Sequence, residues 1–195
     1  MNYIDALNKI IDSRDFTVGG GSAAALAGAM AAGLIGMVAR LSTKKEYGLS
    51  AEKYICIADK LDEIGKNLLD GAVKDTDSFK KIIEAYAMPK ETEDEKLARS
   101  QAVQESAIGA ATVPLNNGKL CREIFDFYIL IEGKCNPNAA SDLEEGKLLL
   151  NAAISGCVLN IEANLPLIKN VDIKSKFQKE IDYLNCISQK EHFKY

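Results

Sequence analysis

The stretch most suited to chemistry is a short glycine loop followed by a serine. Gly19, Gly20 and Gly21 precede Ser22, and residues 23–39 behind it carry no charge. Three glycines allow backbone angles that other residues avoid, and serine is a good helix N-cap. A glycine loop that opens a helix exposes unpaired N–H groups at the positive end of the helix dipole, where an anion binds readily. The sequence therefore predicts a ligand site at the start of this helix.

Two common phosphate-binding motifs do not fit this loop. Residues 19–24 satisfy G-x-G-x-x-A, but only residues 16–18 could form the preceding strand, and no βαβ pattern follows. A P-loop is excluded because no Gly-Lys-Ser/Thr follows the glycines. The structural alternative to a ligand site is a tight turn with close helix packing.

Asp75 and two asparagines are further candidates for chemistry. Asp75 lies in the middle of an apolar helix face, where a carboxylate costs stability unless it is paired or used. It is either a functional carboxylate or a capping or ion-pairing residue near a helix break at Gly71. Asn160 and Asn164 lie one turn apart on a face of small residues, where their amides could bridge helices or line a cleft.

The residue types present limit the possible chemistry. The single histidine, His192, is three residues from the C-terminus, so acid–base work would fall to Asp, Glu, Lys, Tyr or Cys. The five cysteines form no CxxC pair, so neither a zinc site nor a disulfide framework is indicated, and we expect no metal. The net charge of −4 argues against a nucleic-acid partner.

Hydrophobic periodicity predicts an all-α fold in one domain, residues 1–195. No stretch alternates as a strand does, and loops are short. We expect a bundle of about six helices, several of them long, with one kinked at Pro114. Capping signals are Thr92 to Glu95, Ser141 to Glu144, and Asp172. The expected helices cover approximately residues 3–13, 22–42, 50–87, 92–131, 141–165 and 172 into the C-terminal tail.

Cellular location is also an expectation. The chain begins without a basic segment typical of secretory signals, which favours the cytoplasm. Residues 23–39 barely reach the length of a membrane span and are mostly alanine and glycine, so a buried, closely packed helix is favoured over a membrane helix. Small residues recur there at every fourth position and would let a neighbouring helix approach closely, within this subunit or in a partner.

Several motifs, in order and spacing, resemble the cyclodeaminase domain of formiminotransferase-cyclodeaminase, a family that includes stand-alone methenyltetrahydrofolate cyclohydrolases. The glycine loop and its Ala/Gly helix resemble the family signature, and further matches follow along nearly the whole chain. These matches are Lys45 with Tyr47, Asp75 with Ser78 and Phe79, residues 88–92 with Glu95 and Lys96, Val113 to Leu115, Asn136 with Ser141 to Leu143, and Gly156 with Asn160, Asn164 and Leu165.

The resemblance implies an all-α homodimer with a folate site at or near the subunit interface. It implies a folate one-carbon enzyme acting at the 5,10-methenyl carbon of tetrahydrofolate, as a cyclohydrolase, a cyclodeaminase or both. Neither reaction needs a cofactor beyond the folate, which could be polyglutamylated, and a separate formiminotransferase is a possible partner. Asp142 and Asp75 would be the catalytic carboxylates. The substrate-binding residues would be Gly19, Gly20, Gly21, Ser22, Lys45, Asn136, Ser141, Asn160 and Asn164.

Four positions depart from the family pattern. Val18 stands where proline is usual, and Cys135 stands where a glycine usually precedes the loop asparagine. Glu162 and Ala163 replace apolar residues. The departures at Val18 and Cys135 support an alternative hypothesis, a non-catalytic helical folate-binding or scaffold protein of the same fold. Folate turnover distinguishes the two.

Overall fold

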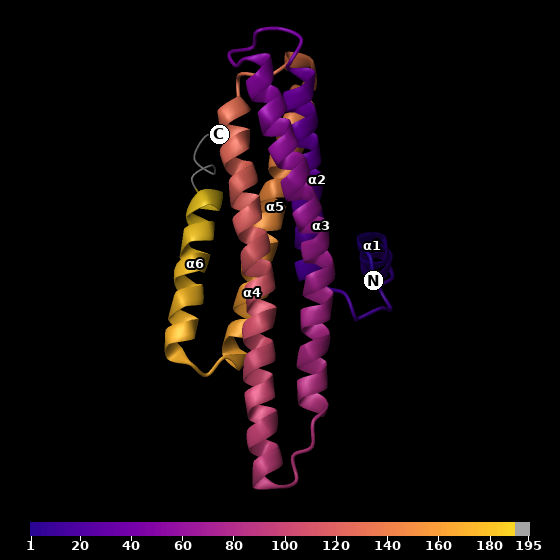
Figure 1. Ribbon diagram of the computed structural model, residues 1–195, viewed down its shortest axis with the longest axis vertical. Coiled ribbons are helices and arrows are strands. Elements are labelled where there is room, and N and C mark those ends of the chain that lie inside the picture. Colours follow the sequence, from indigo (N-terminus) through magenta and orange to yellow (C-terminus); the bar gives the residue numbers. More distant parts are fainter. Residues whose placement is uncertain (190–195) are drawn as a thin grey trace.

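The computed structural model describes residues 1–189, and every regular element in that range is a helix (Figure 1). The elements are α1 (Tyr3–Ile11), α2 (Gly20–Leu41), α3 (Ala51–Ala87), α4 (Glu93–Ile131), η1 (Pro137–Ala139), α5 (Ala140–Asn164), η2 (Leu165–Leu167) and α6 (Val171–Gln189), where η marks a 3-10 turn. The predicted all-α bundle of six helices is confirmed.

Four helices form the central bundle. Helix α2 packs against α3 and α5, and α4 packs against the same two neighbours from the opposite corner. Helix α6 lies along α4 and α5, and α1 lies on the other side, against α2 and α3 (Figure 1). Because α3 has 37 residues and α2 only 22, α2 begins near the middle of α3. The glycine loop is therefore placed at mid-height of the molecule.

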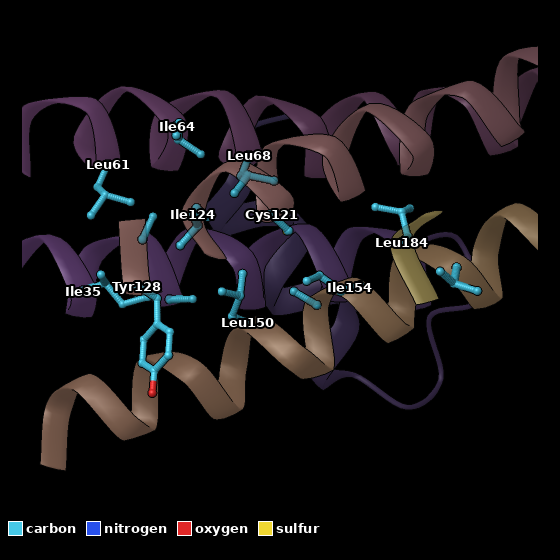
Figure 2. Close-up of a cluster of buried hydrophobic side chains, with 14 of the residues drawn as sticks. Ile35, Leu61, Ile64, Leu68, Cys121, Ile124, Tyr128, Leu150, Ile154 and Leu184 are labelled. Carbon is cyan, nitrogen blue, oxygen red and sulfur yellow. The ribbon is translucent and has the colours of Figure 1, made fainter. Parts of the chain in front are cut away.

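Apolar side chains at helical spacing fill the space between these helices. Ile35 of α2, Leu61 and Leu68 of α3, Ile124 of α4 and Ile154 of α5 are all buried and meet in one cluster (Figure 2). Their burial supplies the main driving force for folding.

The small residues of α2 allow close packing within this subunit. A Cβ atom added at Gly28 would lie 2.7 Å from Cys121 Sγ and 3.2 Å from Leu68 Cδ1. One added at Gly36 would lie 3.4 Å from Leu61 Cβ. The contact at Gly28 is too short for a Cβ atom unless its neighbours shift, whereas the one at Gly36 is an ordinary van der Waals distance.

Helix starts follow the sequence signals only in part. Thr92 forms the predicted capping box with Glu95. The predicted caps at Ser141 and Asp172 are wrong. The 3-10 turn before α5 moves its start to Ala140, so Ser141 lies inside the helix, and the side chain of Asn170, not Asp172, accepts the N–H of Ile173.

Helix α3 runs without a break through Gly71. A Cβ atom there would lie 2.1 Å from Asn117 Oδ1, so the glycine makes room for α4 instead of ending α3. Helix α4 also continues as one helix through Pro114.

Two stretches have the length and composition of a membrane span, namely Gly20–Leu41 and Pro137–Leu167. The buried core helix of a soluble protein passes the same test, and α2 is partly buried by its packing against α3 and α5.

Candidate functional site

The glycine loop opens α2 without a side-chain cap. Gly19 is the N-cap, and α2 begins at Gly20. The N–H groups of Gly20 and Gly21 belong to the first turn, so they have no acceptor within the helix. None of the three glycines has a positive φ, because the only such glycines in the described chain are Gly48 and Gly133. Close contacts therefore account for Gly20 and Gly21, whereas a Cβ atom at Gly19 would meet nothing within 4 Å.

The predicted N-cap role of Ser22 is wrong. Ser22 lies one turn inside α2 and is completely buried. Its Oγ lies 2.8 Å from the carbonyl oxygen of Ala72, 3.1 Å from Asp75 Oδ2 and 3.1 Å from Thr76 Oγ1. The hydroxyl thus joins α2 to α3 instead of capping its own helix, and it touches the carboxyl group of Asp75.

The surroundings of Asp75 stabilise the protonated form of its carboxyl relative to the charged form. The Ser22 hydroxyl has one hydrogen, so it cannot donate to Ala72 and Asp75 at the same time. When it donates to Ala72, the closer partner, a protonated Asp75 can donate to Ser22 Oγ. Burial raises the pKa of Asp75 above its ordinary value, although hydrogen bonds from the hydroxyl and backbone N–H of Ser22 partly oppose the shift.

The two explanations of Asp75 can now be separated. Helix α3 does not break at Gly71, and Asp75 forms no ion pair among residues 1–189. A half-buried carboxyl with a raised pKa and no cationic partner is typical of a group that moves protons. The structure therefore favours the functional interpretation over the capping one.

Gly20 and Gly21 bring the loop against polar side chains. A Cβ atom added at Gly21 would lie 2.3 Å from Asp75 Oδ1 and 2.6 Å from its Cγ. One added at Gly20 would lie 3.3 Å from Asn160 Nδ2. The glycine at position 21 is thus what lets the Asp75 carboxyl rest against the start of α2.

Asn160 and Asn164 form the facing wall, and their amides are oriented by α5 itself. Asn160 Nδ2 donates to the carbonyl oxygen of Gly156 at 2.7 Å, and Asn164 Nδ2 donates to that of Asn160 at 2.8 Å. Because backbone carbonyls only accept, both amide nitrogens must face the helix. The amide oxygens then remain available as acceptors.

The Ala110 carbonyl is exposed to this wall by Pro114. Proline has no N–H, so Pro114 cannot bond to the carbonyl four residues earlier, which is that of Ala110. Asn164 Nδ2 lies 3.4 Å from that oxygen. The proline pattern in the sequence could have pointed to Ala110, which was not among the predicted site residues.

These groups surround one pocket of about 180 Å³. Gly19, Gly20, Gly21, Asp75, Asn160 and Asn164 of the predicted site line it. This volume is below the several hundred Å³ of a typical site for a whole ligand, so the pocket suits one end of a larger molecule. Lining residues that were not among the predicted site residues are Phe16, Thr17, Thr76, Ser78, Phe79 and Ala110.

The other predicted residues lie at the far end of α2. The Asn136 N–H donates to Ser42 Oγ at 2.8 Å, and its amide donates to the Leu41 carbonyl, so Asn136 caps the end of α2. Ser141 and Asp142 follow in the first turn of α5, and Lys45 is exposed on the loop after α2. Helix α2 separates the two ends by about 30 Å at 1.5 Å per residue. One chain therefore does not bring Asp142 and Asp75 together.

No cluster of three His, Cys, Asp or Glu side chains arranged to hold a metal is found among the described residues. The pocket is lined by the Asp75 carboxyl and by three hydroxyl residues, Thr17, Thr76 and Ser78, and Asp75 also contacts the buried hydroxyl of Ser22. Such a set can transfer protons and bind polar groups without further ligands.

Comparison with known proteins gives a consistent result. The family model described as Formiminotransferase-cyclodeaminase matches residues 3–183. The chain is 31% identical over 169 residues to a methenyltetrahydrofolate cyclohydrolase of Methylorubrum extorquens, covering 86% of this chain and 81% of that protein. It is 27% identical to a formimidoyltransferase-cyclodeaminase of Gallus gallus, covering 93% of this chain but only 34% of that longer protein.

A solved structure agrees with these relatives. The crystal structure of a formiminotetrahydrofolate cyclodeaminase from Thermotoga maritima superimposes with a TM-score of 0.78 at 26% identity, over 89% of this chain and 83% of that one. These matches agree with the helical bundle and with the glycine loop at the start of α2. The chain therefore belongs to the formiminotransferase-cyclodeaminase family.

Proposed function

We propose that this chain is a folate one-carbon enzyme acting at the 5,10-methenyl carbon of tetrahydrofolate. The observation that carries the proposal is the Asp75 carboxyl, held between the start of α2 and the amides of α5 in a small pocket. Membership of a family with cyclohydrolase and cyclodeaminase members supports the reaction type. A scaffold role without turnover would leave the raised pKa of Asp75 without a use.

The proposed reactions need one group that takes up and returns a proton. In hydrolysis, water attacks the cationic methenyl carbon and loses a proton to Asp75. The bond to N5 then breaks, N5 takes the proton from Asp75, the second proton of the water is released, and 10-formyltetrahydrofolate results. In cyclodeamination, N10 attacks the formimino carbon and its proton passes to the formimino nitrogen. Asp75 then supplies a second proton to that nitrogen, and the carbon–nitrogen bond breaks to release ammonia and leave the methenyl cation. A carboxylate beside the cationic carbon also stabilises its charge.

The rest of the pocket suits the pterin end of the folate. The free N–H groups of Gly20 and Gly21 can donate to a ring carbonyl. The amide oxygens of Asn160 and Asn164 can accept from ring N–H and amino groups. Donors on one wall and acceptors on the other would fix the ring with its one-carbon unit beside Asp75.

The direct test is a spectrophotometric assay with both substrates. Loss of the ultraviolet absorbance of methenyltetrahydrofolate on addition of the protein identifies a cyclohydrolase, and appearance of that absorbance from formiminotetrahydrofolate identifies a cyclodeaminase. We expect at least one of the two. Folate binding without turnover of either compound would support the scaffold alternative instead.

We also propose that the chain works as a homodimer whose second copy completes the site. An apolar stripe at spacings of three and four runs along α2 from the half-buried Leu26 through the exposed Met30, Gly33, Met37 and Leu41. Met30 is 54% exposed and Leu41 42%. Such a stripe marks a contact surface, and a two-fold axis across it would pair α2 with an antiparallel copy.

This pairing explains why the predicted residues lie at two ends of α2. In an antiparallel pair the far end of one α2 lies beside the start of the other. Asp142 of one copy, with Ser141, Asn136 and Lys45 near it, would then approach the Asp75 pocket of its partner. The catalytic pair would form between subunits.

Cofactors, location and further partners follow from the same proposal. Neither reaction changes an oxidation state, so the enzyme would need no redox cofactor and no metal beyond its folate substrate. We place it in the cytoplasm, without a nucleic-acid or membrane partner. A separate formiminotransferase could supply the formimino substrate.

Substitution Gly21→Ala tests the contact between the loop and Asp75. The new methyl group would overlap the carboxyl, so Asp75 must turn away, and we expect kcat to fall about 10²-fold. Helix content and thermal stability should stay near the wild-type values because alanine favours the helix. In the control Gly109→Ala the methyl meets nothing within 4 Å, so activity should be retained. A fully active Gly21→Ala variant would contradict the placement of Asp75.

A further inference from the structure

Phe16 is an aromatic side chain at the rim of the Asp75 pocket that the described chain leaves uncovered. It lines the pocket and is 84% exposed, the highest value among the large apolar residues of the described chain. A single exposed apolar residue on a protein surface is ordinary. This one lies at the mouth of a polar pocket beside a second exposed aromatic residue, Phe79, so its position points to a ligand.

The connection that carries Phe16 is held in place by its neighbours. Figure 1 shows this connection leaving the bundle at mid-height to reach α1. The Thr17 N–H donates to Asp15 Oδ1 at 2.7 Å, and the Thr17 hydroxyl donates to the same carboxylate. Lys9 Nζ of α1 donates to Thr17 Oγ1 at 3.2 Å and forms an ion pair with Asp15 at 3.5 Å. With Val18 buried on the other side, the backbone holds Phe16 at the rim.

Phe79 supplies a second aromatic surface from a different element. It lies on α3 one turn after Asp75, lines the same pocket and is 45% exposed. Phe16 and Phe79 do not pack on each other, because the ring pair formed within residues 1–189 is that of Phe125 and Tyr128. The mouth of the pocket therefore presents two separate aromatic surfaces, and such surfaces bind flat rings by stacking.

The size of the pocket decides which ring of the substrate reaches these surfaces. A volume of about 180 Å³ takes one end of the proposed folate and no more. When the pterin end lies among the polar walls, the next rigid group along the substrate is the p-aminobenzoyl ring. That ring is flat, aromatic and uncharged, so it matches an apolar rim better than it matches the polar walls.

We propose that Phe16 is a substrate-binding residue that covers the p-aminobenzoyl ring of the folate at the mouth of the pocket, with Phe79 on α3 as the second contact. The inference rests on the proposed function, because it assigns a further part of the same bound substrate. A ring held at the rim fixes the orientation of the whole molecule, which keeps the one-carbon unit beside Asp75.

The alternative cover for Phe16 is a second copy of this chain. The proposed dimer brings the start of the partner's α5 toward the Asp75 pocket, close to the rim. The two covers differ in when Phe16 becomes buried. A partner subunit covers it in the free protein, whereas the substrate covers it only on binding.

Substitution Phe16→Ala removes the ring, and we expect the KM for the folate substrate to rise about tenfold with a much smaller change in kcat. Phe16 touches the bound ring and not the reacting carbon, which is why the effect falls on KM. Phe16→Tyr keeps the flat face and should restore KM. Phe16→Leu keeps apolar bulk without that face, so its KM should lie closer to that of Phe16→Ala.

The matched control is Ile11→Ala, at the end of α1. Ile11 is 71% exposed and does not line the pocket, so its loss should leave KM unchanged. A Phe16→Ala variant with the wild-type KM would overturn the inference, and so would a Phe16→Leu variant with the wild-type KM, because the contact would then not depend on an aromatic face.

A fluorescence measurement reads the same contact without turnover. The chain contains no tryptophan, so Phe16→Trp provides a single indole at the pocket mouth. Acrylamide should quench this indole readily in the free protein, because position 16 is exposed. Saturation with 5-formyltetrahydrofolate should lower the Stern–Volmer quenching constant several-fold. In the control Ile11→Trp the constant should be the same with and without the folate.

The outcomes separate this inference from the proposed function. Shielding of the indole by the folate would support the inference even if neither folate reaction were observed. Turnover of folate by a protein whose indole stays equally accessible would overturn the inference and leave the proposed function intact. An indole that is already shielded in the free protein would also overturn it, because the cover would then be a second copy of the chain.

Discussion

Substitution Asp75→Asn is expected to lower kcat by about 10²–10⁴-fold, the usual contribution of one proton-transferring group. Asparagine keeps the size of the side chain and its acceptor oxygen, so the contact with Ser22 and the packing against Gly21 can persist. It cannot take up or release a proton near neutral pH. The loss would therefore be one of chemistry rather than of fold.

The same substitution should raise the free energy of unfolding at neutral pH. Burial raises the pKa of Asp75 in the folded state above that in the unfolded state. Between these two values the folded protein binds more protons than the unfolded one, so stability falls as pH rises through the interval. Above the interval the full cost of ionising Asp75 is present. Asparagine does not titrate, so the variant does not carry this cost. The difference in free energy of unfolding between the variant and the wild type should disappear at pH values below the ordinary aspartate range, where Asp75 is protonated in both states.

Urea unfolding at several pH values, together with the folate assay, measures both effects. The control is Asp70→Asn, which changes an exposed carboxylate on the same helix and should leave activity and stability near wild type. The acid limb of the wild-type kcat/KM profile should lie above the ordinary aspartate range, in line with the raised pKa. An Asp75→Asn variant that is fully active would remove Asp75 from the mechanism, and one that is inactive but less stable would point to a structural role.

Most of the fold was predictable because its signals are local. Apolar residues at spacings of three and four set the helices, and the capping box at Thr92 set the start of α4. The errors arose where a tertiary contact outweighed a local preference. Ser22 has the right chemistry for an N-cap, but its hydroxyl is held by Ala72 and Asp75 of α3. Gly71 resembles a helix break, but its missing side chain makes room for Asn117.

The sequence predicted which residue types form the site, but not which of these residues lie together in the folded chain. Asp75 and Asn160 were recognised because polar residues on apolar or small-residue faces need an explanation. Sequence order cannot tell that Asp75 lies at the start of α2 and Asp142 beyond its end, since this depends on how the bundle is connected. The exposed Ala110 carbonyl was missed because it depends on a residue four positions later, Pro114, and on a partner from α5.

The separation of Asp75 and Asp142 leads to the second large prediction, which concerns two inactive variants. We expect Asp142→Asn to be as inactive as Asp75→Asn, because each removes one carboxyl from the proposed shared site. In a mixed dimer of the two variants, one site receives both altered residues and the other receives neither. Random pairing makes half of all dimers mixed, so co-expression should restore about a quarter of the wild-type activity.

The restored activity is measured with the folate assay on dimers purified through two different affinity tags, one on each variant. In the tag-selected mixed dimers about half of the wild-type activity should return, because one of two sites is intact. The control pairs Asp75→Asn with a chain carrying both substitutions, which leaves every site without Asp75 and should restore nothing. Activity of Asp142→Asn alone would exclude Asp142 from the reaction. If the two inactive variants never complement each other, the carboxyls of a site do not come from different subunits, and the proposed shared site is wrong. Both carboxyls would then have to come from one chain. Because about 30 Å of helix α2 separates them, such a site would require a rearrangement of the bundle.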